Sequence, residues 1–271
     1  MDLIFFLVQK TMLFSIPLLV VALGGMFSER SGIVNIALDG IMIFGAFCSV
    51  LFLNFAQDYM SGQLLLLIAI LIAGISGIVI SLLHAYASIN LNSDQVISGT
   101  AINLLAPALA IYVARMIQGV QQITFDNTFR IPAVPVLSDI PIIGPMFFKQ
   151  AYLTTYIGFG ILVVAVIVLY KTRFGLRLRA CGEHPQAADS VGINVYKMRY
   201  FGVMISGFLG GLGGLIFVVP TSTEFNSTVS GYGFLALAVM IFGNWKPLPI
   251  LGAALFFGVM KTIAAAYSGI P

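Results

Sequence analysis

The sequence predicts an all-α integral membrane protein with about eight transmembrane helices. Of its 271 residues, 59% are hydrophobic and only 8% are charged, whereas about a quarter of the residues in a soluble domain are charged. The apolar residues also form runs of about 20, the length that an α-helix needs to cross roughly 30 Å of hydrocarbon. The run LLLLIAILIAGISGIVISLL at 64–83 lacks the alternation of transmembrane β-strands, so helices are favoured over a β-barrel.

Eight apolar runs are the candidates for these helices. In chain order they are 11–27, 32–53, 64–84, 96–116, 152–171, 199–219, 231–245 and 247–267. The preceding MDLIFFLVQK lacks the basic region of a signal peptide, so we expect it to lie in the membrane interface or to lengthen the first span. Ala73/Gly77 and Gly207/Gly211 are pairs of small residues at the spacing that lets helices pack closely.

The distribution of basic residues predicts the orientation of the helices. Six of the thirteen basic residues lie between Lys171 and Arg199, so this loop is expected to be cytoplasmic. Counting spans outward places the Glu29/Arg30 turn, the loop at 85–95 and the Lys246 turn on the same side. The proline-rich segment 117–151 and both ends of the sequence then lie outside. We therefore expect one transmembrane domain, 1–271, with an external loop at 117–151 and a cytoplasmic loop at 172–198.

Two stretches of the sequence resemble each other. SGIVNIAL at 31–38 matches SGYGFLAL at 230–237, and IMIFG at 41–45 matches VMIFG at 239–243 after a shift of one residue. The first copy begins inside and the second outside, as an inverted repeat requires. Inverted repeats in transporters place the substrate route near the membrane midplane, between the copies. Chance or the shared composition of packed helices explains so short a match equally well, so both interpretations stay open.

The first polar cluster is SERSGIVNIALDG at 28–40, and Asp39 is its most informative residue. A carboxylate near the bilayer centre costs at least about 2.5–3.5 kcal/mol, so Asp39 must face protein, water or a partner. If the helix breaks near Gly32 or Gly40, free backbone groups and Asn35 would line a cavity around Asp39. The alternative is that Asp39 caps a half-helix or pairs with Arg30, and serves only the fold.

The second polar cluster is NSDQVISGTAINLL at 92–105. Asp94 or Ser93 is expected to cap a helix that begins near Gln95. Ser98, Thr100 and Asn103 lie further along this span, where hydrogen-bonding groups cost free energy unless they find partners. They either face a polar solute or hold helices together, and the sequence favours neither role.

Catalytic and metal-binding patterns are missing from the sequence. His84 and His184 have no companion at catalytic or ligand spacing and are expected to be surface or capping residues. Cys48 and Cys181 form neither a disulfide framework nor a metal motif, and no G-x-x-x-x-G-K-[ST] phosphate loop is present. We therefore expect no catalytic residue, no metal and no cofactor on this chain. Because the basic residues gather in one loop, the net charge of +3 does not indicate binding to nucleic acid.

Within the cytoplasmic loop, CGEHPQAADSVG at 181–192 carries the signals of a short helix. Pro185 suits the first helical position, and Gly192 suits the position after the end. A short helix held between two spans would offer a soluble partner a rigid contact. The alternative is a solvated basic loop with an incidental turn.

Four segments resemble the permease subunits of bacterial ABC importers. They are SERSGIVNIALDGIMIFGAF at 28–47, DQVISGTAINLLA at 94–106, TRFGLRLRACGEHPQAADSVGINV at 172–195 and GYGFLALAVMIFGNWKPLPILGAALFFG at 231–258. The group resembled serves branched-chain amino acids, simple sugars and nucleosides, and nucleoside permeases are the most similar. The resemblance implies a multi-pass subunit of the bacterial cell (inner) membrane that moves nucleosides or related sugars into the cytoplasm. Such a subunit is no enzyme, because ATP-Mg is hydrolysed on a partner ATPase.

The resemblance also implies partners and functional residues. The partners are ATP-binding subunits, a second and different permease subunit, an extracytoplasmic solute-binding lipoprotein and membrane lipid. The residues implied for ATPase coupling are Gly182, Glu183, Gln186, Ala187, Ala188 and Gly192, with Gln186 in place of the commoner glutamate. The expected translocation path comprises Asn35, Asp39, Ser98, Thr100 and Asn103, with Asp39 where many relatives have glutamate. Because relatives usually continue for about one more span, a further helix is expected beyond Pro271. An ion-coupled secondary transporter that uses Asp39 is the alternative function.

Overall fold

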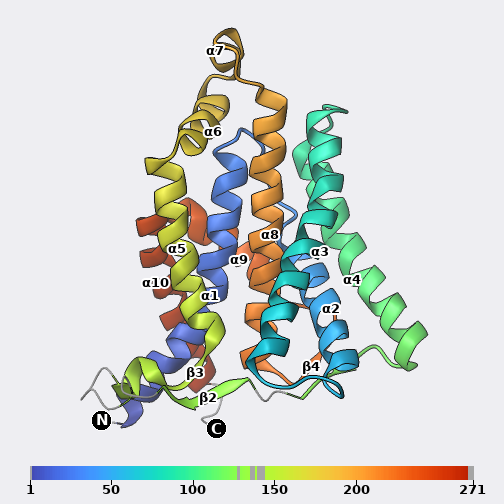
Figure 1. Cartoon of the computed structure of the whole chain (residues 1–271), viewed down its shortest axis with the longest axis vertical. Coiled ribbons are helices and arrows are strands. Elements are labelled where there is room, and N and C mark those ends of the chain that lie inside the picture. The colour runs from blue at the N-terminus through green and yellow to red at the C-terminus, as the bar shows by residue number, and fades with distance from the viewer. Residues whose placement is uncertain (1, 127–128, 135–137, 139–143, 268–271) are drawn as a thin grey trace.

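Long helices packed side by side form the computed structural model of the chain (Figure 1). The structure describes residues 2–126, 129–134, 138 and 144–267. Among these, seven helices are long and apolar enough to cross a membrane. They are α1 (Asp2–Glu29), α2 (Leu38–Ala56), α3 (Gln63–Ile89), α4 (Gln95–Gln118), α5 (Leu153–Lys171), α8 (Val195–Thr221) and α10 (Pro247–Tyr267). The predicted helical membrane fold is therefore confirmed.

Two of the predicted spans differ from the helices that form. The run 231–245 contains α9 (Tyr232–Phe242), whose 11 residues measure about 16 Å, so α9 is too short to cross a membrane alone. The run 32–53 begins with non-helical chain, and α2 starts only at Leu38. Both differences arise because each apolar run includes residues outside the helix: 32–37 precede α2, and 243–245 follow α9. The expected helix beyond Pro271 lies outside the described residues.

Opposite ends of the bundle carry the two predicted loops (Figure 1). At one end, β1 (Ile123–Thr124) pairs with β4 (Glu224–Phe225), and β2 (Arg130–Ala133) pairs with β3 (Lys149–Tyr152) after a π-helical turn at Gly144–Phe148. At the other end, α6 (Arg173–Glu183) and α7 (Pro185–Ser190) project beyond the bundle. The described residues of the expected external segment 117–151 and the basic loop thus lie at opposite ends, as a transmembrane orientation requires.

The long helix α8 runs through the middle of the bundle and packs against α1, α2 and α3. Its glycines make this packing possible. A Cβ atom on Gly207 would overlap Ser81 on α3, and one on Gly211 would overlap the Ala73 carbonyl oxygen. The small residues for which close packing was predicted therefore bring the backbones of α3 and α8 into contact.

Candidate functional site

Residues 30–37 turn back into the bundle between α1 and α2. Gly32 has a φ of +91°, a left-handed conformation that glycine adopts without a steric penalty. Contact with α4 fixes how deep in the bundle α2 begins. The amide of Gly40, in the first turn of α2, donates to Asn103 Oδ1 on α4 at 2.7 Å. Asn103 lies eight residues along α4 from Gln95, or about 12 Å from that end. The helix α2 therefore begins well inside the bundle, where backbone polar groups need protein partners.

Asn103 supplies two of these partners. Its side chain accepts from the Gly40 amide and donates to the Ile36 carbonyl oxygen at 2.9 Å. The two bonds use one acceptor and one donor of the same amide group, and they bridge the start of α2. Asn103 was predicted as part of a translocation path, and its contacts here serve the fold.

His84 and Ser98 hold the same segment from α3 and α4. The His84 Nε2 atom lies 3.0 Å from the Val34 carbonyl oxygen, and its Nδ1 atom lies 2.9 Å from Ser98 Oγ. Since a carbonyl oxygen only accepts, Nε2 carries the proton and Nδ1 of the neutral ring accepts from Ser98. Gln95 accepts from the Val34 amide at 2.7 Å. His84 is fully buried, so the expectation of a surface histidine is wrong. The one sequence signal for a buried histidine was that His84 stands alone in an apolar run.

Asn35 and Thr100 also bond within the chain. Asn35 is fully buried, donates to Ser206 Oγ at 2.9 Å and accepts from the Ala37 amide at 3.1 Å. Thr100 is exposed on α4 and donates to the Val96 carbonyl oxygen of its own helix at 2.9 Å.

The expected cap of α4 is confirmed at Asp94. Its Oδ1 atom accepts from the Val96 amide at 2.7 Å and from the Ile97 amide at 3.3 Å. The side chain thus satisfies two of the amides that the first turn of a helix leaves without a partner. Ser93, the other candidate, makes no such bond, and its hydroxyl has no hydrogen-bond partner among the described residues.

Asp39 lies where the starts of α2 and α9 meet. Its Oδ1 atom accepts from the Gly233 amide at 2.9 Å. A Cβ atom on Gly233 would overlap the Asp39 backbone, so only glycine permits this approach. A partly exposed carboxylate thus lies between the N-terminal ends of two helices, both of which favour negative charge. Arg30 bonds elsewhere, so it does not neutralise Asp39.

The two similar stretches of sequence, 31–38 and 230–237, lead into α2 and α9 respectively. Their helices start at different aligned positions, because α2 begins at the last residue of the first stretch and α9 at the third residue of the second. An inverted repeat that relates the two stretches stays a prediction.

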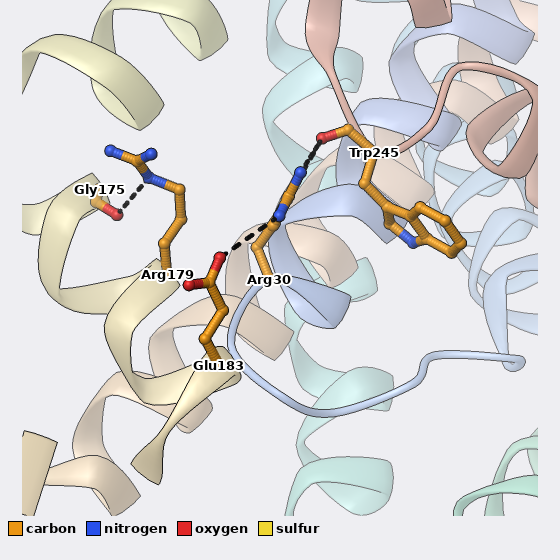
Figure 2. A network of polar contacts seen from close by, with 5 residues as sticks. All are labelled: Arg30, Gly175, Arg179, Glu183 and Trp245. Carbon is orange, nitrogen blue, oxygen red and sulfur yellow. Dashed lines mark hydrogen bonds and ion pairs between the residues drawn. The ribbon is translucent and has the colours of Figure 1, made fainter. Parts of the chain in front are cut away.

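Arg30 connects three segments at the end of the bundle that carries α6 (Figure 2). Its Nη2 atom donates to the Trp245 carbonyl oxygen at 3.0 Å, and Nη1 lies 4.0 Å from Glu183 Oε1. The Trp245 indole donates in turn to the Glu29 carboxylate. A Cβ atom on Gly182 would overlap the Arg30 carbonyl oxygen. The end of α6, the turn after α1 and the turn after α9 therefore form one contact cluster.

The short helix α7 lies at the tip of the molecule (Figure 1). It spans Pro185–Ser190, and Gly192 follows with a φ of +83°, which confirms the predicted short helix. Ala188 is only 3% exposed and packs inward, whereas Gln186 and Ala187 are exposed. A partner that contacts α7 would therefore meet Gln186 and Ala187 first.

The described residues contain no group of three His, Cys, Asp or Glu side chains close enough to hold a metal ion. Cys48 and Cys181 are both free thiols. Burial raises the pKa of the Cys181 thiol, against the opposing effect of the Arg199 charge. Cys181 is therefore a poor nucleophile at neutral pH.

Comparison with known proteins places these features in context. Residues 7–271 match the family model described as branched-chain amino acid transport system / permease component. The guanosine ABC transporter permease protein NupQ of Bacillus subtilis is 46% identical, over 98% of this chain and 83% of the relative. The nucleoside ABC transporter permease protein NupC of Lactococcus lactis is 44% identical, over 98% and 84%. The putative glucose ABC transporter permease protein TsgC13 of Haloferax volcanii is 31% identical, over 95% and 76%.

Proposed function

The chain belongs to the permease-component family of branched-chain amino acid transport systems, and on this premise we propose that it moves nucleosides as one subunit of an ABC importer. It is a multi-pass membrane protein and a transport component. The observation that carries the choice of solute is the identity of 46% and 44% to relatives named for guanosine and nucleosides, against 31% for one named for glucose. An ion-coupled secondary transporter is not favoured, because these relatives are permeases of ABC transporters.

The proposed solute route passes Asp39. This carboxylate is partly exposed and lies beside the N-terminal end of α9. The carboxylate is a hydrogen-bond acceptor and the backbone amides of the helix end are donors, so both kinds of group occur together. Such a pair suits the hydroxyls and base edges of an uncharged nucleoside. The hydrogen bonds of Asn35, Ser98 and Asn103 are made within the chain, which supports a role in holding the lining in place. Thr100, on the exposed face of α4, stays a predicted member of the route.

The proposed source of energy is ATP-Mg hydrolysis on separate ATP-binding subunits, which dock on α7. Two observations support this docking site. The face of α7 that carries Gln186 and Ala187 is exposed, and Gly192 ends the helix with a defined turn. A displacement of α7 would be transmitted to α6, whose last residues are Gly182 and Glu183. These residues contact the turn after α1, which is linked to the turn after α9, on either side of the solute route.

Two further partners complete the proposal. One is a second permease subunit, and the other is an extracytoplasmic lipoprotein that delivers the solute. In support of the second permease, α4 and α10 leave large apolar side chains uncovered, such as Leu104 and Met116 on α4, at 75% and 70% exposure, and Phe256 on α10, at 54%. The subunit composition of the purified complex tests this part: two different permease chains are expected, and a single kind of permease chain would contradict it.

Uptake by the reconstituted complex tests the function. Labelled guanosine, uridine, ribose, glucose and leucine are offered to proteoliposomes with and without ATP in the lumen that corresponds to the cytoplasm. We expect ATP-dependent, vanadate-sensitive accumulation of the nucleosides. Accumulation of a sugar or of leucine alone would overturn the nucleoside assignment. Uptake that runs without ATP and collapses with a protonophore would restore the ion-coupled alternative.

A further inference from the structure

A cavity of about 320 Å³ lies near the outer end of the bundle, opposite α6 and α7. It is formed by α1, the end of α8, the start of α9 and α10. Its lining includes Lys10, Phe14, Phe217, Thr221, Tyr232 and Lys261. The cavity is therefore amphipathic, with two cations beside aromatic rings.

Close packing of α1 and α10 brings Lys10 and Lys261 to the lining of one cavity. Each precedes a buried threonine, and the hydroxyls of Thr11 and Thr262 lie 3.3 Å apart across α1 and α10. A Cβ atom on Gly258 would overlap Ser15, so the two helices are in close contact here. Two like charges that line one cavity repel each other more strongly away from bulk water. Both ammonium groups line one cavity, where a bound anion would reduce their mutual repulsion.

Neither Lys10 nor Lys261 forms an ion pair within 4.0 Å in the described part of the chain. There, the one ion pair within 4.0 Å is Arg30 with Glu183, at the opposite end of the bundle. The Lys10 and Lys261 ammonium groups each lie 5.6 Å from a ring centroid, of Phe6 and Tyr232 respectively. A neighbouring cavity of about 260 Å³ shares Lys10 and adds Arg130 and Lys149 to its lining. The region is thus basic on both sides of Lys10.

The position of Lys261 favours a lipid headgroup as the anion that the cavity would bind. Lys261 is exposed on α10 between the exposed apolar residues Met260 and Ile263, on a face suited to lipid. It lies six residues before the end of α10, or about 9 Å, a depth from which a lysine reaches the headgroup region. We propose that this cavity binds the phosphate group of an anionic phospholipid, with Lys10 and Lys261 as its counter-ions. An uncharged nucleoside would not neutralise this pair, so the proposed ligand differs in class from the solute of the proposed route.

The test compares lipid binding by the full chain and by the double variant K10Q/K261Q, both purified in a mild detergent. Phosphatidylglycerol is titrated in, and the bound molecules are counted by native mass spectrometry, with phosphatidylcholine as the uncharged lipid. We expect the double variant to bind phosphatidylglycerol roughly thirtyfold more weakly, because each lysine strengthens binding to anionic lipid by roughly fivefold. Phosphatidylcholine should bind equally to both proteins.

Controls make the test decisive. K171Q/K197Q removes the same charge at the other end of the molecule and should keep the wild-type affinity, and K10R/K261R should keep it because both charges remain. If K10Q/K261Q does not fold, the salt dependence of binding to the wild-type chain replaces it, since added salt screens a charge-driven contact. Equal binding by wild type and K10Q/K261Q, or binding that ignores salt, would overturn the proposal. Inorganic phosphate that displaces the lipid and stabilises the protein as well as phosphatidylglycerol does would assign the site to a soluble anion instead.

Discussion

Asp39 is the residue at which fold and transport can be separated. An asparagine keeps the oxygen that accepts from the Gly233 amide but removes the negative charge between the two helix ends. We expect Asp39→Asn to lower nucleoside uptake roughly tenfold. The solute would lose a hydrogen bond to a charged group, and a loss of that size corresponds to about this factor. The amount of folded complex should change little. Uptake per folded complex measures the difference.

Asp94 provides the matched control for Asp39. It accepts backbone hydrogen bonds in the same way, but at the start of α4 and away from the proposed route. Asp94→Asn should therefore leave uptake close to the wild-type level. If Asp39→Asn reduces folded protein and uptake in equal proportion, then Asp39 serves as a cap only.

Asn103 is expected to be a stability residue. Asn103→Ala leaves the Gly40 amide and the Ile36 carbonyl oxygen without their partners inside the bundle. Each unsatisfied buried group costs about 1–3 kcal/mol, so the variant should unfold at clearly lower temperature. Asn54→Ala, which removes a donor to the Thr124 carbonyl oxygen and an acceptor from Gln118 at a half-buried position, is the control and should lower the unfolding temperature less. Normal unfolding of Asn103→Ala with lost uptake would instead place Asn103 on the solute route.

At the scale of the elements, α7 presents two alanines with opposite surroundings. Ala187→Arg adds bulk to the exposed face, so ATPase activity should become uncoupled from uptake while the protein stays folded. Ala188→Arg forces a charge into a site that is 3% exposed, so it should reduce the amount of folded protein. ATPase activity, uptake and yield are measured side by side. Normal coupling in Ala187→Arg would remove α7 as the docking helix.

Arg30 holds the turn after α1 to the turn after α9 more strongly than it holds either turn to α6. Its pairing with Glu183 spans 4.0 Å and involves a side chain that is 71% exposed, so it contributes about 0–1 kcal/mol. Its bond to the Trp245 carbonyl oxygen is shorter, at 3.0 Å. Arg30→Gln should therefore lower the uptake obtained per ATP several-fold, whereas Glu183→Gln should change it little. A larger loss in Glu183→Gln would show that the ion pair carries the coupling.

At the scale of the whole molecule, the two loops should react with reagents on opposite sides of the membrane. In a background with Cys48 and Cys181 replaced by serine, Asp126→Cys should react with an impermeant maleimide in intact cells. Ala187→Cys should react only after permeabilisation. The reverse pattern would invert the orientation, and with it the side on which α7 meets an ATPase.

The sequence by itself determined the membrane class, six of the eight predicted spans, the cap of α4 and the short helix in the basic loop. These features depend on composition, on run length and on contacts between residues that are close in the chain. Asp39 could be selected for the same reason, because a carboxylate in an apolar run is costly wherever the chain folds.

Only the tertiary structure decided what the remaining polar residues do. The sequence shows that Asn35, Ser98 and Asn103 are polar, but it does not show their partners. Asn35 bonds to Ser206, Ser98 to His84, and Asn103 to the backbone of residues 36 and 40, all far away in the chain. The short length of α9 was hidden because hydrophobicity does not show where within the run 231–245 the helix ends. The shared cavity of Lys10 and Lys261 was hidden for a related reason: 251 residues separate Thr11 from Thr262, whose contact joins α1 to α10. Such long-range contacts are set by how the helices pack, which local patterns do not record.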